Sequence, residues 1–373
     1  HFHYVLCLSE AKGMDIKMDK RMSNDSRSNN INMLRFVGAV MVIAGHMGNI
    51  LGTEVPTFLG VGIHAMGVRI FFLLGGFLIT QSWLSDPNPA RYMVKRVFRI
   101  FPALVVFVIV AAYIVGPLCT IMSPKEYFSD PGVAVFAIKN IFLYPYYSLP
   151  GVFTDLPYPY VVNGSLWTLP VEFAMYLMVP IIAVLIGLKK KDKKSFILLS
   201  ILAVIAYLIS IRIQYGDEWH CVVYGTDIGQ AFALIPYYLV GMLFVFPCMR
   251  KLLNIQIATL AVLLYSCLKY EGGIVNEILI FVIFSYLIFS LAFATPPYFV
   301  NRFRKCEVSY GIYLYGFMIQ QVVVYVCKLQ DIVLSFSAYL FVSLTATSLI
   351  SVISYKMVEE SIQKISKRIL KKI

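Results

Sequence analysis

Long stretches of apolar residues alternate along the chain with short polar segments. A run of about 20 apolar residues is long enough to cross the hydrocarbon core of a bilayer as a helix. The pattern predicts ten such helices, at residues 33–52, 66–84, 99–122, 166–187, 195–213, 228–247, 253–268, 274–294, 308–328 and 332–357. We therefore expect an all-α polytopic membrane protein with about ten transmembrane helices.

Composition supports one membrane domain and argues against several soluble ones. Of the 373 residues, 59% are apolar and 14% are charged, and the mean hydropathy is +0.76. Soluble domains are roughly 45–50% apolar and about 25% charged. We divide the chain into a polar N-terminal tail (1–32), a membrane domain (33–358) and a basic C-terminal tail (359–373). The first apolar tract, Tyr4–Leu8, is too short for a signal peptide, so the first span is expected to act as an uncleaved anchor.

The net charge of +12 is explained by its distribution. With a cytoplasmic N-terminus, ten alternating spans place 24 Lys and Arg residues in cytoplasmic segments and 5 in outside segments. Because Lys and Arg concentrate on the cytoplasmic side of membrane proteins, both termini are predicted to be cytoplasmic. The same distribution argues against nucleic acid as a partner. The 7 cysteines show no pairing pattern and predict neither a disulfide framework nor a zinc site.

The longest outside segment, residues 123–165, is rich in aromatic residues and proline. Since Trp and Tyr prefer the headgroup level of a membrane, we expect this segment to form an interfacial cap with a short helix near 134–144. No internal repeat and no appended soluble domain is visible in the sequence.

Ionisable residues inside a predicted span are costly and mark candidate functional positions. Arg35 and His46 are eleven residues apart, close to three helical turns. They therefore share one face of the first helix, about 16 Å apart along its axis. Gly38, Gly45 and Gly48 on this helix, with Gly52 at its end, would let neighbouring backbones approach closely. A single intramembrane histidine can also serve only as a hydrogen-bonding residue between helices, and that alternative stays open.

Glu172 lies about six residues into the fourth predicted span, counted from its outer end. The first helix enters from the cytoplasm and the fourth from outside, so Glu172 is expected to reach the depth of His46. A carboxylate beside a histidine can orient the imidazole and stabilise its protonated form. The alternative is a structural pair of Glu172 with Arg69 or with a tyrosine hydroxyl.

Arg96 and Arg99 lie three residues apart near the cytoplasmic start of the third predicted span. This spacing places both guanidinium groups on one helical face, where bidentate binding of phosphate groups is favourable. Topology signalling and binding of lipid headgroups are alternative explanations for the same two residues.

Six segments carry a resemblance to a known family. They are Arg35-x10-His46, 71–79, 95–103, 165–172, 308–315 and 355–360. In this order, and within a frame of ten spans, the chain resembles the acyltransferase 3 family of integral membrane acyltransferases over residues 31 to about 365.

The resemblance implies transfer of an acyl group, usually acetyl, from cytoplasmic acyl-CoA to a hydroxyl of an extracytoplasmic polysaccharide or lipid-linked sugar. It implies that His46 is catalytic, as a general base in direct transfer or as a transient acyl carrier, and we favour direct transfer. The other expected roles are assistance to His46 by Glu172, binding of the CoA phosphates by Arg96 and Arg99, lining of the thioester path by Arg35 and Arg69, and acceptor binding by Trp167 and Tyr176. We expect acyl-CoA as a co-substrate and neither a metal ion nor a permanently bound cofactor.

Two other classes of function stay open. A transporter or flippase for a lipid-linked sugar or small solute could use His46 and Glu172 as a proton relay, although the repeats common in transporters are not seen. A receptor or assembly component without catalytic activity is the third class. In each case the expected location is a bacterial inner membrane, with membrane lipids as partners and a homo-oligomer left open.

Overall fold

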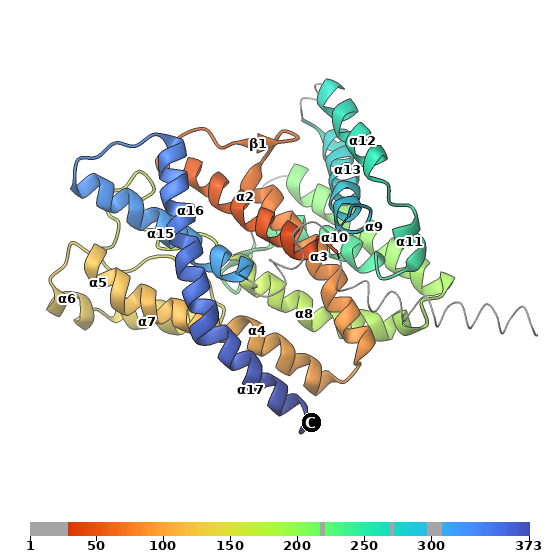
Figure 1. Ribbon diagram of the computed structural model, residues 1–373, viewed down its shortest axis with the longest axis horizontal. Helices are drawn as coiled ribbons and strands as arrows, with labels where there is room; N and C mark the ends of the chain where they lie inside the picture. The colour runs from red at the N-terminus through yellow and green to blue at the C-terminus, as the bar shows by residue number, and fades with distance from the viewer. Residues whose placement is uncertain (1–28, 217–220, 269–271, 297–307) are drawn as a thin grey trace, which may run out of the picture.

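The computed structural model describes residues 29–216, 221–268, 272–296 and 308–373 (Figure 1). Every predicted span contains a helix. The ten helices are α2 (Ile31–Leu51), α3 (Ile63–Ser85), α4 (Pro89–Val110), α8 (Thr168–Leu185), α9 (Lys193–Tyr215), α10 (Ile228–Leu243), α12 (Ile255–Leu268), α13 (Ile274–Phe293), α15 (Ser309–Leu329) and α16 (Phe336–Ser354). The predicted all-α membrane fold is confirmed.

Eight of these helices are long and apolar enough to cross a membrane. α4 reaches this length together with a π-helical turn η1 (Ala111–Val115) and α5 (Gly116–Cys119). α10 and α12 are shorter, with 16 and 14 residues. The strands of the described residues form two short hairpins, β1 (Thr57–Phe58) with β2 (Val61–Gly62) and β3 (Val222–Val223) with β4 (Thr226–Asp227).

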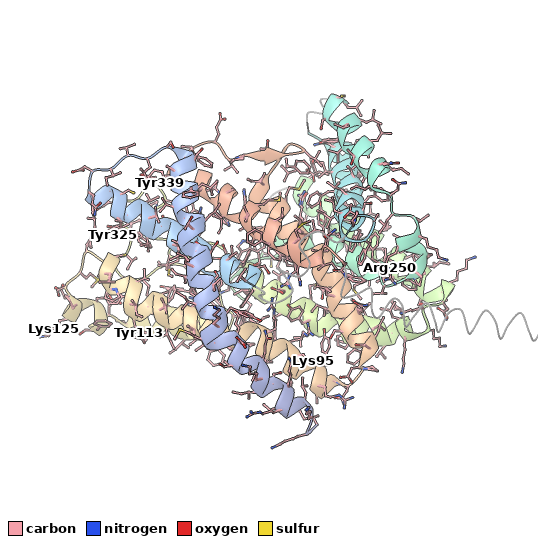
Figure 2. The ribbon with its side chains drawn as sticks, in the orientation of Figure 1. Lys95, Tyr113, Lys125, Arg250, Tyr325 and Tyr339 are labelled. Atoms are coloured by element: carbon pink, nitrogen blue, oxygen red, sulfur yellow. The ribbon has the colours of Figure 1, made fainter. Side chains whose placement is uncertain are left out.

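The two ends of the helical bundle carry the residues that the charge pattern assigns to opposite sides of the membrane. Figure 2 shows Lys95 and Arg250, predicted to be cytoplasmic, toward the right of the molecule. Lys125, predicted to be outside, lies at the left edge, and Tyr325 and Tyr339 lie on the same side. We therefore refer to these two ends as the inner and outer ends of the bundle.

Part of each predicted tail packs against the helical bundle. Residues 1–28 of the N-terminal tail lie outside the described residues, but Asn30 belongs to the bundle and donates hydrogen bonds to Thr295 Oγ1 at 2.7 Å and to the Pro296 carbonyl at 2.9 Å. At the other end, α16 continues through a π-helical turn η3 (Tyr355–Glu359) into α17 (Glu360–Leu370), which packs against α4. The basic C-terminal segment is therefore a docked helix.

Polar residues between the apolar runs determine where several helices begin. Asn88, Asp192, Asp227 and Ser335 precede α4, α9, α10 and α16, and each side chain accepts a hydrogen bond from a backbone N–H in the first turn. Such caps satisfy N–H groups that have no partner within the helix. Because the Asp192 carboxylate accepts the Ser195 N–H, the pKa of Asp192 is lowered.

Glycines let α2, α3 and α10 approach each other at the centre of the bundle (Figure 1). A Cβ atom on Gly67 of α3 would lie 2.5 Å from the carbonyl oxygen of Gly38 in α2. A Cβ atom on Gly76 of α3 would lie 2.0 Å from the carbonyl oxygen of Tyr238 in α10, and one on Gly241 would lie 2.1 Å from that of Leu73. Small residues at such crossings allow the close backbone contact that favours helix association in a membrane.

The segment 123–165 packs against α4 and α15, and its expected interfacial position stays a prediction. It contains α6 (Pro124–Ser129) and α7 (Pro131–Ile141), and α7 corresponds to the short helix expected near 134–144. The amide of Asn163 donates to the Leu314 carbonyl at 2.7 Å, and the amide of Gln321 donates to the carbonyls of Tyr158 and Val161 at 2.8 and 2.7 Å. Buried amides from this segment and from α15 therefore hold the cap in place.

We predict that Gly76→Ala destabilises the protein, because its new methyl group would collide with the α10 backbone. Overpacking of this kind costs about 1–3 kcal/mol, to be measured as a lower melting temperature of the detergent-solubilised protein. Gly75→Ala is the matched control, since a Cβ atom there would meet only the Tyr238 ring, at 3.4 Å. Equal melting temperatures for the two variants would contradict the proposed role of the Gly76 contact.

Candidate active site

A cavity of about 500 Å³ lies beneath the outer cap, and we call it the outer cavity. Its walls come from α2, α3, α10 and α15 and from the cap segment. The lining residues are His46, Asn49, His64, Ala65, Val68, Arg69, Tyr147, Tyr158, Val161, Gly164, Trp167, Gln230, Ala233, Leu234, Tyr313 and Phe317. Polar and aromatic side chains dominate this list, which suits a polar ligand with apolar ring faces.

His46 forms part of the wall of the outer cavity and has aromatic neighbours on two sides. Its ring centroid lies 5.4 Å from that of His64 and 5.2 Å from that of Phe317. His46 is partly exposed to the cavity, and among the described residues neither of its ring nitrogens has a hydrogen-bond partner. The imidazole is therefore available to accept a proton from a group bound in the cavity.

His64 lies beside His46, and no pattern in the sequence indicated it as a functional residue. It occupies the first turn of α3, and its Nδ1 atom is buried without a hydrogen-bond partner among the described residues. His64 can lie this close to α2 because Gly45 has no side chain. A Cβ atom on Gly45 would lie 2.6 Å from both Cβ and the backbone nitrogen of His64. The glycine-rich face of the first helix predicted a close approach but not which residue would use it.

A second, narrower cavity of about 40 Å³ lies closer to the inner end, and we call it the inner chamber. Its lining residues are Arg35, Val68, Phe71, Phe72, Gly75, Arg99, Ile100, Thr168, Glu172, Tyr238, Tyr310 and Tyr313. Two cations and one carboxylate therefore face a space otherwise surrounded mainly by aromatic rings.

Val68 and Tyr313 line both cavities and form the wall between them. The Tyr313 hydroxyl donates to the Ser165 carbonyl at 3.1 Å and lies 2.5 Å from the Thr168 hydroxyl. The Phe71 ring packs edge-on against the Tyr313 ring, with centroids 5.6 Å apart. A single layer of side chains thus separates the cation-lined chamber from the cavity that contains His46.

The expectation that Glu172 meets His46 is corrected by the structure. Glu172 lines the inner chamber, and its carboxylate accepts a hydrogen bond from the Tyr176 hydroxyl. Glu172 follows Trp167 by five residues, which is about 500° of helical rotation, so the two side chains point roughly 140° apart. α3 also packs against both α2 and α8. Similar depth in the membrane therefore did not bring Glu172 and His46 together, and the alternative of a tyrosine hydroxyl partner is confirmed.

The two residues assigned to acceptor binding lie in different places. Trp167 lines the outer cavity with His46. Tyr176 is buried, and its ring lies beneath the Arg96 guanidinium at 5.6 Å, while its carbonyl accepts a hydrogen bond from the Tyr92 hydroxyl at 2.8 Å. Tyr176 is therefore part of the packing around Glu172 and Arg96, outside the cavity that contains His46.

The residues expected along the thioester path are likewise divided between the cavities. Arg35 lines the inner chamber, as its position on the inner half of α2 predicts. Arg69 lines the outer cavity, where its guanidinium lies 5.1 Å from the Tyr237 ring centre. Arg69 therefore lines the same cavity as His46, and not the chamber that Arg35 and Arg99 line.

Arg99 lines the inner chamber, and Arg96 lies three residues before it on α4. Arg99 approaches Glu359 at 3.8 Å and Tyr310 at 5.4 Å, and its side chain is 18% exposed. Arg96 donates to the Ser82 hydroxyl at 3.1 Å, and its Nε atom is a buried donor without a hydrogen-bond partner among the described residues. An unused guanidinium donor favours an additional anionic ligand.

Arg91 and Lys95, on the same helix, already share a carboxylate. Both form ion pairs with Asp86, at 2.6 and 2.9 Å. Hydrogen bonds, first from Arg91 and then from Lys95, hold the pKa of Asp86 well below its usual range. The four cations near the start of α4 therefore fall into two pairs. Arg91 and Lys95 share Asp86, whereas Arg96 lies against the rings of Tyr92 and Tyr176 and Arg99 lies against the ring of Tyr310.

Comparison with known proteins identifies a family and several relatives of this chain. The chain matches the acyltransferase domain family over residues 28–356. It is 27% identical over 344 residues to the O-acetyl transferase of Shigella phage Sf6, covering 90% of this chain and 96% of that protein. It is 26% identical over 321 residues to nodulation protein 10 of Rhizobium leguminosarum bv. viciae, covering 79% of this chain and 84% of that protein.

A more distant relative is the regulator of hypoxia-inducible factor 1 of Caenorhabditis elegans, which is 25% identical over 244 residues, or 59% of this chain and 44% of that protein. No solved structure matches the chain. Since the family match spans most of the sequence and the fold is an all-α membrane bundle, the chain belongs to the acyltransferase 3 family of integral membrane acyltransferases.

Proposed function

We propose that this membrane acyltransferase moves an acetyl group from cytoplasmic acetyl-CoA to a hydroxyl of a polysaccharide or lipid-linked sugar on the outer side of a bacterial inner membrane. The observation that carries the proposal is the pair of cavities on either side of Val68 and Tyr313. One faces the cationic inner end and the other contains His46 under the outer cap. A donor that carries phosphate groups could therefore approach the layer of Val68 and Tyr313 from the inner end, and a sugar acceptor could approach it from the outer cavity.

The name of the phage relative, O-acetyl transferase, supports both the acyl group and the oxygen acceptor. The polar and aromatic lining of the outer cavity supports a sugar, because sugar rings bind through hydroxyl hydrogen bonds and apolar faces. The Arg96 Nε donor and the nearby Arg99 support binding of the CoA phosphates at the inner end.

In the proposed reaction His46 acts as a general base. The acceptor hydroxyl oxygen attacks the thioester carbonyl as its proton moves to the free imidazole nitrogen of His46. The new C–O ester bond forms, the C–S bond breaks, and the departing CoA sulfur takes the proton back from His46. The thioester is already activated, so this direct transfer balances without an additional reactant. His64, 5.4 Å away, limits the ring positions available to His46.

We predict that His46→Ala lowers acetyl transfer about 10²–10⁴-fold, the usual contribution of a general base. Native membranes supplied with radiolabelled acetyl-CoA would be assayed for label in the alkali-labile glycan fraction. Val37→Ala is the control, because Val37 lies on the same helix and is 39% exposed on its outer surface. Full acetyl transfer by His46→Ala would rule out this role. If the wild type transfers no acyl group and His46→Ala loses flux of a solute or lipid-linked sugar, a transporter would be favoured.

We predict that Arg96→Ala raises the apparent KM for acetyl-CoA at least about tenfold, because a charge-assisted hydrogen bond contributes about 1.5–3 kcal/mol. The KM for the acceptor should change much less. Arg91→Ala is the matched control, since Arg91 lies on the same helix but pairs with Asp86. An equal loss with both substrates, or an equal effect of Arg91→Ala, would argue against phosphate binding by Arg96.

A further inference from the structure

An apolar groove of about 500 Å³ lies beside the outer cavity, and we call it the side groove. Its walls come from α4, α8 and α10, from the residues that follow α7 and from the hairpin of β3 and β4. The lining side chains are apolar except for the hydroxyl groups of Tyr224 and Thr226. Phe142, Leu177 and Val223 line the groove and are exposed, so the groove opens on the surface of the bundle.

The side groove and the outer cavity lie on different faces of α10. Gln230 and Leu234 line the outer cavity, whereas Ala231 and Ile235 line the side groove. Within each pair the residues are four apart and share a face, and the two pairs differ by one position, or about 100° of rotation. The two spaces are therefore separated on this side by the thickness of one helix.

One face of α8 contributes to both spaces. Trp167, directly before the first residue of α8, lines the outer cavity. Val171 and Ala174 follow Trp167 by four and seven residues, which places them on the same helical face, and both line the side groove. This face of α8 therefore borders the outer cavity at its outer end and the side groove deeper in the bundle.

Lys139 lies between the two spaces at their outer end. Its Nζ atom is 4.8 Å from the ring centre of Tyr144 and 4.7 Å from that of Tyr146. The Tyr144 ring packs against Tyr224 of the side groove, with centroids 5.4 Å apart, and Tyr146 directly precedes Tyr147 of the outer cavity. Among the residues that the structure describes, no carboxylate forms an ion pair with Lys139. Its charge is therefore available to an anionic group that lies between the groove and the cavity.

The same end of the side groove contains a hydroxyl without a partner. Thr226 is buried, and its Oγ1 atom has no hydrogen bond within the described part of the chain. The hairpin that contains Thr226 is held in place, since the Tyr224 hydroxyl donates to the Phe142 carbonyl at 2.6 Å. An unpaired buried hydroxyl is unfavourable, so a bound molecule with a polar group at this end of the groove would be favoured.

We propose that the side groove binds the hydrocarbon chain of a lipid-linked sugar acceptor, with its phosphate linker beside Lys139 and its sugar in the outer cavity. Such a molecule matches the three surfaces in order: an apolar groove, one cation, and a polar and aromatic cavity. An ordinary membrane lipid would match the groove and the cation but not the cavity. This inference rests on the proposed function, and of its two acceptors it selects the lipid-linked sugar over the free polysaccharide.

The test compares two forms of one acceptor with the purified protein in vesicles of phosphatidylethanolamine and phosphatidylglycerol. One form is the lipid-linked glycan extracted from bacterial membranes that the wild type acetylates, and the other is the same glycan released from its lipid by mild acid. With radiolabelled acetyl-CoA, we expect kcat/KM to be at least about tenfold higher for the lipid-linked form, because the groove buries several methylene groups of its chain.

Two substitutions separate the groove from the cation. Ala174→Trp fills the groove from an exposed position of α8 and should raise the KM for the lipid-linked acceptor at least about tenfold. Lys139→Gln should raise the same KM by a similar factor, because it removes a charged partner of the phosphate. Neither substitution should change the KM for acetyl-CoA or the transfer to the released glycan.

Each substitution has a matched control. Val184→Trp places the same ring on an exposed position of α8 outside the groove. Lys125→Gln removes another lysine of the segment 123–165, on α6, that lines neither the side groove nor the outer cavity. Both control variants should keep the wild-type KM for the lipid-linked acceptor.

A photoactivatable polyisoprenyl phosphate gives a readout that does not depend on activity. We expect it to label α8 and α10 at the groove, and the lipid-linked glycan, but not excess phosphatidylglycerol, to reduce the labelling. Equal competition by phosphatidylglycerol would mean that ordinary membrane lipid occupies the groove, and would overturn the inference.

Two results of the transfer assay would also overturn the inference while leaving the proposed function intact. One is equal kcat/KM for the two forms of the acceptor, and the other is an unchanged acceptor KM in folded Ala174→Trp and Lys139→Gln proteins. By contrast, a wild type that transfers acetyl to neither form, and does not bind CoA, would reject the proposed function and with it this inference.

Discussion

The close contact of α3 with α2 on one side and α10 on the other is the constraint on which the rest of the site depends. In a membrane, helices gain little from hydrophobic burial against each other, so close packing of backbones supplies much of their association. The pairs Gly38 with Gly67 and Gly76 with Gly241 make that packing possible. Because α3 is held so closely, His64 comes to lie beside His46, and Val68 comes to lie in the wall between the two cavities.

The arrangement of charge follows from the same contact. Arg35 lies toward the inner end of α2 and His46 toward its outer end, and the two side chains line different cavities. A layer containing Val68 and Tyr313 lies between a space lined by Arg35 and Arg99 and a space lined by His46, His64 and Arg69.

Much of this arrangement could be predicted from particular residues. The face shared by Arg35 and His46, the glycines of the first helix and the cationic pair Arg96 and Arg99 were all recognised from spacing within one helix. The position of Glu172 could not be predicted from its depth alone, because depth along a helix does not give the rotation of that helix about its axis. His64 was missed because it lies in the first turn of α3, after a hairpin, where no periodic pattern marks it as facing another helix.

The sequence by itself determined the class of fold and the approximate bounds of the helices, and its loop charges predict the side of the membrane that each loop faces. These are local properties, since the bilayer fixes the length of an apolar run and the charge of each loop biases its location. Only the tertiary structure decided which side chains share a cavity, and it paired His46 with His64 and Glu172 with Tyr176. The physical reason is that the rotation and closeness of helices are set by contacts between residues far apart in the chain, such as Gly76 and Gly241, which no single helical pattern contains.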